Sequence, residues 1–411
     1  MKKLREILDK QAGLFEKGGK FEKLYPLYEA HDTLLFTPGE VTRTASHVRD
    51  GLDLKRMMVT VVIALLPCIL FALYNTGFQI HNTIEWGGSP LDSWQTALYT
   101  ATGLGFDPDN VLANVLHGAC YYVPIFAACF ATGGAVEVTT AILRKHEVNE
   151  GFLVTGMLIP LTLPATIPLW QVVLGTAFGV IFAKEIFGGT GMNFLNPALT
   201  ARAFLFFAYP AQISGDIWIA AEAADGLSGA TADAFSGATL LAQAAVDGNA
   251  LVGREGLWMD AFLGFIPGSM GESSAAACLL GALVLVISGV GSWRTMAGVA
   301  IGTGIMAVLL NIAGSETNPM LGVPPEWHYV LGGWAFGAVF MATDPVSSAF
   351  TDLGKLIYGF CIGVLVVLVR AVNPAYPEGM MLAILFMNMF APLIDHFIVQ
   401  ANIKRREARY A

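Results

Sequence analysis

The chain has 411 residues, of which 55% are hydrophobic and 13% charged, and its formal net charge is −9. Soluble domains carry about 25% charged residues, so this composition predicts an all-α polytopic membrane protein rather than a soluble one. We expect the lipid bilayer, and no nucleic acid, among its partners. The five cysteines lie singly in apolar runs, which predicts neither a disulfide framework nor a metal cluster.

Residues 1–56 are predicted to form a cytoplasmic arm. The first apolar run begins only near Met57, behind a polar stretch too long for the charged region of a secretory signal. The arm holds eleven basic residues, whereas Lys and Arg are absent from Met57 to Leu143. Four more basic residues crowd the tail at 400–411. By the positive-inside rule, both termini are predicted to be cytoplasmic.

Apolar runs predict ten membrane spans, since a bilayer core requires on the order of 20 apolar residues per helix. The first five lie at 57–76, 112–142, 151–167, 169–187 and 199–211, and the second five at 275–292, 295–313, 329–342, 356–373 and 379–399. Ten crossings return the chain to its starting side, as the basic termini require. Arg370, near the predicted external end of its span, departs mildly from the positive-inside pattern.

The ten spans divide into a first membrane repeat at 57–211 and a second at 275–399. The acidic, Gly/Ala/Ser-rich segment 212–274 is predicted to connect them on the external side. Because each half has an odd number of spans, the two halves are expected to have opposite orientations, as in an inverted repeat.

Two short motifs are expected at equivalent points of these halves, Asn196-Pro197 and Asp344-Pro345. Proline after Asn or Asp breaks a helix, and the polar side chain can cap the next one. The alternative is that Asn196 and Asp344 border a central ion or cofactor pathway, because broken helices line cavities rather than face lipid. Both interpretations remain open from the sequence.

Carboxylates at membrane depth are costly and are therefore candidates for function. Glu137, Asp344 and Asp395 are the three in this chain. The alternative for each is a residue solvated at a helix end.

The external connection contains Ser-Gly-Ala-Thr twice, ending at Thr231 and at Thr239. A threonine in a small-residue loop outside the membrane is an accessible hydroxyl that can take a phosphoryl-linked group. The alternative is that Thr239 only caps the apolar helix that follows it.

Five stretches resemble the B subunits of the sodium-translocating NADH:quinone oxidoreductases: 145–151, 193–199, 202–216, 341–347 and 372–381. The resemblance implies a urea-transporter-like fold of two inverted five-helix repeats in the bacterial cell inner membrane. It also implies a redox-driven sodium pump with partner subunits A, C, D, E and F. NADH is expected to bind another subunit, because no nucleotide-binding glycine motif follows a strand here.

The resemblance also implies cofactors and site residues. FMN is expected on Thr239, with Thr231 as the alternate because the motif is doubled, and a non-covalent riboflavin is expected, with Asn193 and Asn196 as cavity candidates. Ubiquinone is expected at Gly133, Gly134 and Glu137, and the sodium pathway at Glu29, Glu137, Asp344 and Asp395. Three other functions remain: the D subunit of the homologous Rnf electron-transport complex, a urea-transporter-like solute channel, and a structural scaffold.

Overall fold

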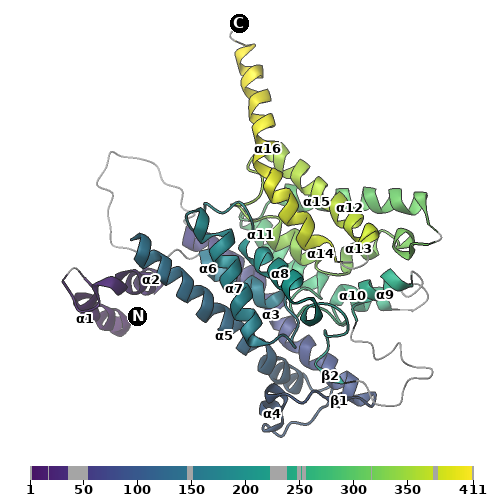
Figure 1. The fold of residues 1–411 in the computed structure, drawn as a ribbon, viewed down its shortest axis with the longest axis horizontal. Helices are drawn as coiled ribbons and strands as arrows, with labels where there is room; N and C mark the ends of the chain where they lie inside the picture. Colours follow the sequence, from purple (N-terminus) through teal and green to yellow (C-terminus); the bar gives the residue numbers. More distant parts are fainter. Residues whose placement is uncertain are drawn as a thin grey trace.

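The structure is a computed structural model that describes residues 2–16, 18–35, 54–145, 151–222, 238–247, 251, 256–315, 317–373 and 378–409. Most of these residues are helical. Figure 1 shows a bundle of long helices, with two short N-terminal helices at its side and the last turns of the final helix projecting from it.

The N-terminal arm contains a helical hairpin built from α1 (Lys2–Phe15), η1 (Glu22–Leu24) and α2 (Tyr25–Leu35). Phe15 stacks on Tyr28 with ring centroids 5.2 Å apart, and Arg5 donates to Asp32 across 2.7 Å. Helix α2 packs against α5, so the hairpin lies beside the bundle (Figure 1).

The first half of the bundle follows. Its elements are α3 (Leu54–Glu85), β1 (Ser89–Pro90), α4 (Trp94–Thr100), α5 (Val111–Arg144), α6 (Gly151–Leu161), α7 (Leu169–Ala183), η2 (Glu185–Phe187), α8 (Pro197–Ala208) and η3 (Pro210–Gln212). Polar side chains set several helix starts: Asn110 accepts from the backbone N–H of Ala113 at 3.2 Å and so caps α5.

The connection and the second half complete the chain. Their elements are β2 (Ala221–Glu222), α9 (Leu240–Val246), α10 (Leu257–Leu263), α11 (Ala275–Ile287), α12 (Trp293–Ala313), η6 (Pro319–Gly322), α13 (Trp327–Val330), α14 (Trp334–Phe336), η7 (Gly337–Met341, a π-helical turn), α15 (Asp352–Val372) and α16 (Met380–Glu407). Strands β1 and β2 pair antiparallel, with Ser89 opposite Glu222, and join the connection to the end of α3.

Six helical segments in the described ranges are long and apolar enough to cross a membrane. They are Arg56–Glu85, Val111–Arg144, Leu169–Phe187, Trp293–Ala313, Asp352–Val372 and Met380–Glu407. Each overlaps a predicted span. The apolar helices α6, α8 and α11 coincide with three further predicted spans but are shorter. For these three, and for the broken segment at 329–342, crossing of the membrane stays a prediction.

Glycines bring the long helices into backbone contact. A β-carbon on Gly118 of α5 would clash with the carbonyl oxygen of Leu73 in α3, and one on Gly77 of α3 would clash with Asn114. Gly302 of α12 and Gly359 and Gly363 of α15 make the same kind of close backbone contact. Small residues at helix contacts are typical of membrane bundles, where close packing replaces hydrophobic driving force.

The predicted span at 329–342 is not one helix but α13, α14 and the π turn η7. Arg370 of α15 is fully buried and donates to the carbonyl oxygens of His328 (2.8 Å), Leu331 (2.7 Å) and Glu378 (3.0 Å). The carbonyls of His328 and Leu331 lie where helical bonding stops, so the guanidinium satisfies groups that the break leaves free. Its third bond, to Glu378, ties this break to the segment before α16. This structural role explains why a basic residue lies at the predicted external end of α15.

The expected equivalence of Asn196-Pro197 and Asp344-Pro345 is wrong. Asn196 begins α8, the fifth apolar segment, whereas Asp344 follows η7, the eighth. The two positions are therefore one segment out of step between the halves.

Candidate cofactor and ion sites

A cavity of about 340 Å³, here called the Thr239 cavity, opens between the two halves at the predicted external side. Its walls come from α8, the segment after η3, α9, the segment before α11, the turn between α13 and α14, and the segment before α16. It is lined by Phe206, Ile213, Ser214, Gly215, Trp218, Thr239, Leu240, Leu241, Ala242, Ala245, Val246, Ile266, Pro267, Gly268, Ser269, Glu272, Ser273, Leu331, Gly332, Gly333 and Glu378.

Thr239 is the N-cap of α9 and accepts from the backbone N–H of Ala242 at 3.2 Å. The prediction that Thr239 caps the helix that follows it is confirmed. It does not exclude attachment, because the bond uses Oγ1 as an acceptor and the same side chain lines the cavity. Thr231 lies outside the described residues.

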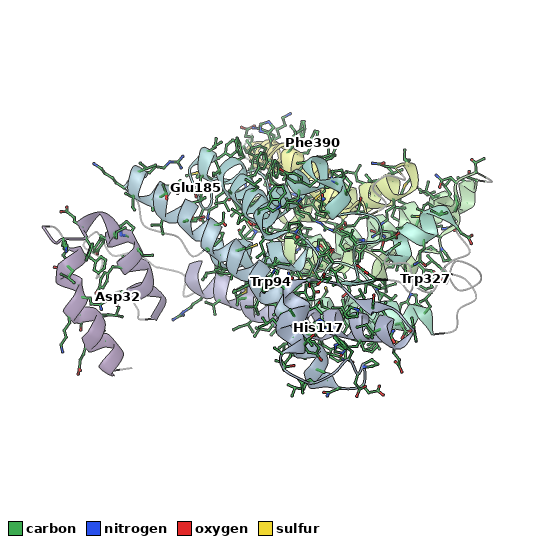
Figure 2. The ribbon with its side chains drawn as sticks, turned by 60° about the horizontal axis from the view of Figure 1, so that its bottom comes forward. Asp32, Trp94, His117, Glu185, Trp327 and Phe390 are labelled. Carbon is green, nitrogen blue, oxygen red and sulfur yellow. The ribbon has the colours of Figure 1, made fainter. Side chains whose placement is uncertain are left out.

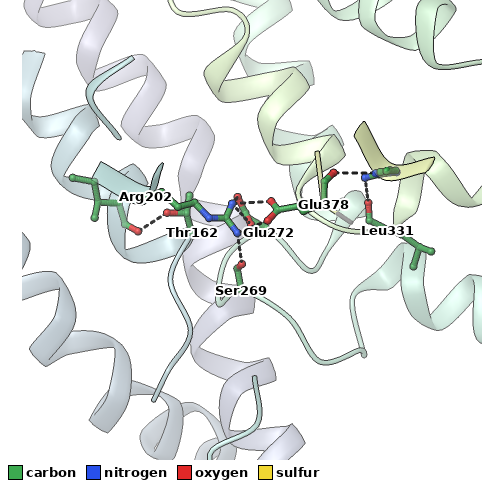
Figure 3. A network of polar contacts seen from close by, with 8 residues as sticks. Thr162, Arg202, Ser269, Glu272, Leu331 and Glu378 are labelled. Carbon is green, nitrogen blue, oxygen red and sulfur yellow. Dashed lines mark hydrogen bonds and ion pairs between the residues drawn. The ribbon is translucent and has the colours of Figure 1, made fainter. Parts of the chain in front are cut away.

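A buried cluster of charges forms one wall of the Thr239 cavity. Figure 3 shows Arg202 of α8 between Glu272 and Glu378, with Ser269 beside it. Arg202 donates to Glu272 at 2.9 and 3.0 Å, to Glu378 at 2.8 and 2.7 Å, and to Ser269 at 3.3 Å. One guanidinium thus joins three segments far apart in the sequence.

The cluster carries two carboxyl groups and one guanidinium. Burial raises the pKa of the Glu272 carboxyl, which lies in the segment before α11, while Arg202 lowers it and Glu378 raises it again. A β-carbon on Gly333 would lie 2.8 Å from Glu378 Oε1 and 2.9 Å from Glu272 Oε1, so only glycine leaves room for both carboxylates.

A second cavity, of about 80 Å³, is here called the Asp344 cavity. It is lined by Met57, Met58, Val61, Gly151, Val154, Thr155, Leu158, Lys184, Thr190, Asn193, Asn196, Pro197, Leu285, Val290, Gly291, Phe340, Thr343, Asp344, Pro345 and Val346. The structure therefore brings together three residues singled out from the sequence: Asn193, Asn196 and Asp344.

These three side chains also organise the local backbone. Asn196 caps α8 by accepting from Ala198 N (3.0 Å) and Leu199 N (3.2 Å). Asp344 accepts from Val346 N at 3.1 Å and from the hydroxyl of Ser347 at 2.7 Å. The capping interpretation holds for Asn196 but not for Asp344, which stabilises a turn, because the next helix, α15, begins only at Asp352 with Thr351 as its N-cap. Both residues border the cavity.

Glu137 lies next to this cavity in a buried ion pair. The Nζ atom of Lys184, at the end of α7, donates to Glu137 of α5, and both side chains are buried. Lys184 is among the residues that line the Asp344 cavity, so it lies between Glu137 and that space. One turn before Glu137, Gly133 packs against the ring of Phe152, whereas no atom lies within 4 Å of a β-carbon built on Gly134.

The remaining two acidic candidates lie apart from both cavities. Asp395 accepts from the backbone N–H groups of Phe350 (2.6 Å) and Thr351 (3.0 Å) and from the Thr351 hydroxyl (2.6 Å), which fixes the turn before α15. Glu29 belongs to α2 in the arm.

Sequence reasoning missed Arg202, Glu272, Glu378 and Lys184 as site residues. Arg202 offered a signal, since a basic residue inside an apolar span is costly unless it has a partner. The other three lie at segment ends, where charged residues are ordinary, and their partners are distant in the sequence.

Comparison with known proteins identifies the family of the chain. The model of the NQR2, RnfD, RnfE family matches residues 41–404. The chain belongs to this family.

Members of this NQR2/RnfD/RnfE family resemble the chain over nearly its whole length. The relative from Chromohalobacter salexigens is 56% identical over 409 residues, covering 99% of this chain and 97% of its own. Those from Ectopseudomonas mendocina and Stutzerimonas stutzeri are 55% identical, each covering 99% of both chains. All three are named as B subunits of a Na(+)-translocating NADH-quinone reductase, so the resemblance inferred from the motifs is confirmed.

Proposed function

We propose that this chain is the flavin-bearing membrane subunit of a redox-driven sodium pump in the bacterial inner membrane. Electrons from NADH enter through partner subunits, pass through the flavins of this chain and reduce ubiquinone, while Na⁺ crosses the membrane. The names of relatives at 55–56% identity support the subunit assignment. The observation that carries the redox role is that Thr239 lines a cavity large enough for a cofactor.

The fold proposed for this function is the ten-crossing inverted repeat of urea-transporter type, with both termini cytoplasmic. Matching contacts in the two halves support it: α5 packs on α7 as α12 packs on α15, and α7 on α8 as α15 on α16. Helix α6 packs on α3 as α14 and η7 pack on α11, and α3 contacts α11 between the halves.

The Thr239 cavity fits a covalently held FMN. Ligand pockets for molecules of this size are roughly 300–1,000 Å³ and mostly apolar, with a few polar groups. Thr239 would hold the phosphate end, Trp218 and Phe206 offer flat surfaces, and Glu272 and Glu378, both bonded to Arg202, form the charged wall. When bound, the flavin supplies electron transfer.

Riboflavin does not fit the Asp344 cavity as shaped, because about 80 Å³ is well below that range. Asn193 and Asn196 remain its proposed contacts by resemblance, and no electron step is assigned to this cavity. Its size, with Asp344 and Asn196 in a mainly apolar wall, suits water or a small ion.

For ubiquinone and Na⁺ we propose Gly133, Gly134 and Glu137 at the quinone site, and Glu137 and Asp344 on the ion pathway. Adding negative charge in a low-dielectric interior is costly unless a cation compensates it, which couples electron arrival to Na⁺ entry. Asp395 and Glu29 remain pathway candidates by resemblance. The bonds that Asp395 makes to the 350–351 turn favour a supporting role for it.

The test is in-gel flavin fluorescence of the denatured protein after co-expression with its flavin transferase. We expect fluorescence in the native chain and in Thr239→Ser, and its loss in Thr239→Asn, which keeps a helix-capping oxygen but has no hydroxyl to esterify. Loss only in Thr231→Ala would move the attachment to the first copy of the motif. Absence of fluorescence from the native chain would favour the channel or scaffold function.

The D subunit of an Rnf complex is the alternative closest in family, since the matching family includes RnfD. Quinone reduction by the purified complex separates the two: turnover with ubiquinone supports the B-type assignment, and its absence supports the Rnf assignment.

A further inference from the structure

Two consecutive charged residues, Lys184 and Glu185, face one side of α5 where α7 ends. Glu137 and Arg144 of α5 lie two helical turns apart and so share a face. Lys184 pairs with Glu137, and Glu185 faces Arg144, with Oε2 3.7 Å from Nη1. This group lies at the end of α5 that carries Arg144, which is the predicted cytoplasmic end. Figure 2 labels Glu185 there, away from His117 near the start of α5.

The two ion pairs are not alike. Lys184 and Glu137 are both buried and in direct contact. Glu185 exposes only 3% of its side chain, and neither of its carboxylate oxygens has a hydrogen-bond donor within the described ranges. Arg144 is 40% exposed, and 3.7 Å is too long for a hydrogen bond. A buried carboxylate without donors is costly, so this geometry indicates a missing ligand.

The chain that follows Glu185 has an irregular, glycine-rich backbone. Gly188, Gly189 and Gly191 have positive φ values of 123°, 99° and 89°, so the chain after α7 is unwound. Gly189 passes below the carboxylate, with its β-carbon position 3.9 and 4.0 Å from the two oxygens. Thr190 Oγ1 is also buried without a hydrogen-bond partner in the described part of the chain, and Thr190 lines the Asp344 cavity.

These groups define the chemistry of the ligand. A buried carboxylate at the negative end of a helix, followed in the chain by a buried threonine hydroxyl without a partner in the described residues, favours a hard cation. In transporters, unwound backbone and helix C-terminal ends are where Na⁺ is coordinated. Lys184 already neutralises Glu137, so Glu185 contributes a single negative charge. A monovalent ion balances that charge.

We propose that Glu185 is the carboxylate that binds Na⁺ from the cytoplasm before the ion reaches the Asp344 cavity. Arg144 is its counter-ion when Na⁺ is absent. When Na⁺ binds Glu185, the guanidinium turns to water, and the charge of the site stays balanced. This inference rests on the proposed function, which supplies Na⁺ as the transported ion, and it assigns the first residue that the ion meets.

The two partners are expected to respond in opposite directions in the purified complex. Glu185→Gln removes the ligand charge, so the half-saturating Na⁺ concentration for quinone reduction should rise about tenfold with an unchanged KM for quinone. Arg144→Gln removes the competitor, so the half-saturating Na⁺ concentration should fall several-fold. Arg294→Gln breaks an exposed ion pair with Asp352 (3.2 Å) at another helix end and is the matched control, with no shift expected.

A binding measurement separates this inference from the proposed function. Broadening of the ²³Na⁺ NMR signal by the oxidised, non-turning complex should weaken in Glu185→Gln and persist in Glu185→Asp. Turnover that needs no Na⁺ in the native complex would overturn the proposed pump. Half-saturating Na⁺ concentrations that move the same way in Glu185→Gln and Arg144→Gln, or equal ²³Na⁺ broadening in native and Glu185→Gln complexes, would overturn the role of Glu185.

Discussion

At the scale of single residues, the charged side chains of this membrane protein are held in groups whose members come from separate segments. Arg202 joins Glu272 and Glu378, and Lys184 holds Glu137. Hydropathy identified Glu137 as a costly buried charge but could not name its partner, because the pairs form only when distant helices pack. A buried charge identified from the sequence therefore predicts that a partner exists, but not which residue it is.

The Lys184–Glu137 pair allows a test of that dependence. Lys184→Met should destabilise the protein by about 3–5 kcal/mol, because it leaves the Glu137 charge buried and unpaired. The double change Lys184→Met with Glu137→Gln removes both charges and should recover most of that loss. Thermal unfolding of the purified complex measures the difference, and a double variant no more stable than the single one would contradict this account.

At the scale of helices, apolar length predicted where segments lie better than how each one is built. Nine of the ten predicted spans each overlap one α-helix, since a stretch solvated by lipid must be apolar and internally hydrogen-bonded. The segment at 329–342 is apolar as well, yet it breaks into short pieces whose free carbonyls Arg370 satisfies. Hydropathy cannot report such a break, because the compensating residue lies on another helix.

Helix contacts also depend on particular glycines, and composition does not show which glycines lie at a contact. Gly118→Ala should destabilise the α3–α5 contact by at least about 1–3 kcal/mol, because the added methyl group meets backbone rather than a movable side chain. Gly134→Ala in the same helix points into open space and should be neutral or slightly stabilising. Comparing their unfolding temperatures tests the packing, and equal loss in both would refute it.

At the scale of the whole molecule, the two halves meet where α3 contacts α11. Two cysteines mark this contact: Sγ of Cys68 lies 3.8 Å from Sγ of Cys278, and both are buried. The sequence predicted two halves and scattered cysteines, but their juxtaposition depends on the relative placement of the halves.

This pair can report whether the contact between the halves is fixed. A membrane-permeant thiol oxidant should join Cys68 to Cys278 with little loss of quinone reduction, since only a small approach of the sulfurs is needed. Cys68→Ser prevents the bond and is the control. If cross-linking stopped turnover while flavin fluorescence remained, α3 and α11 would have to move apart during the cycle.

Gly333 controls the spacing of the negative charges in the wall of the Thr239 cavity, although it carries no charge itself. The hydrogen atom on its α-carbon leaves room for two carboxylates against the chain, so its size sets how close together the negative charges lie. A methyl group there would spread those charges apart without adding or removing any. A substitution between two uncharged residues would then act as an electrostatic one, and it would change the potential that a bound redox group experiences.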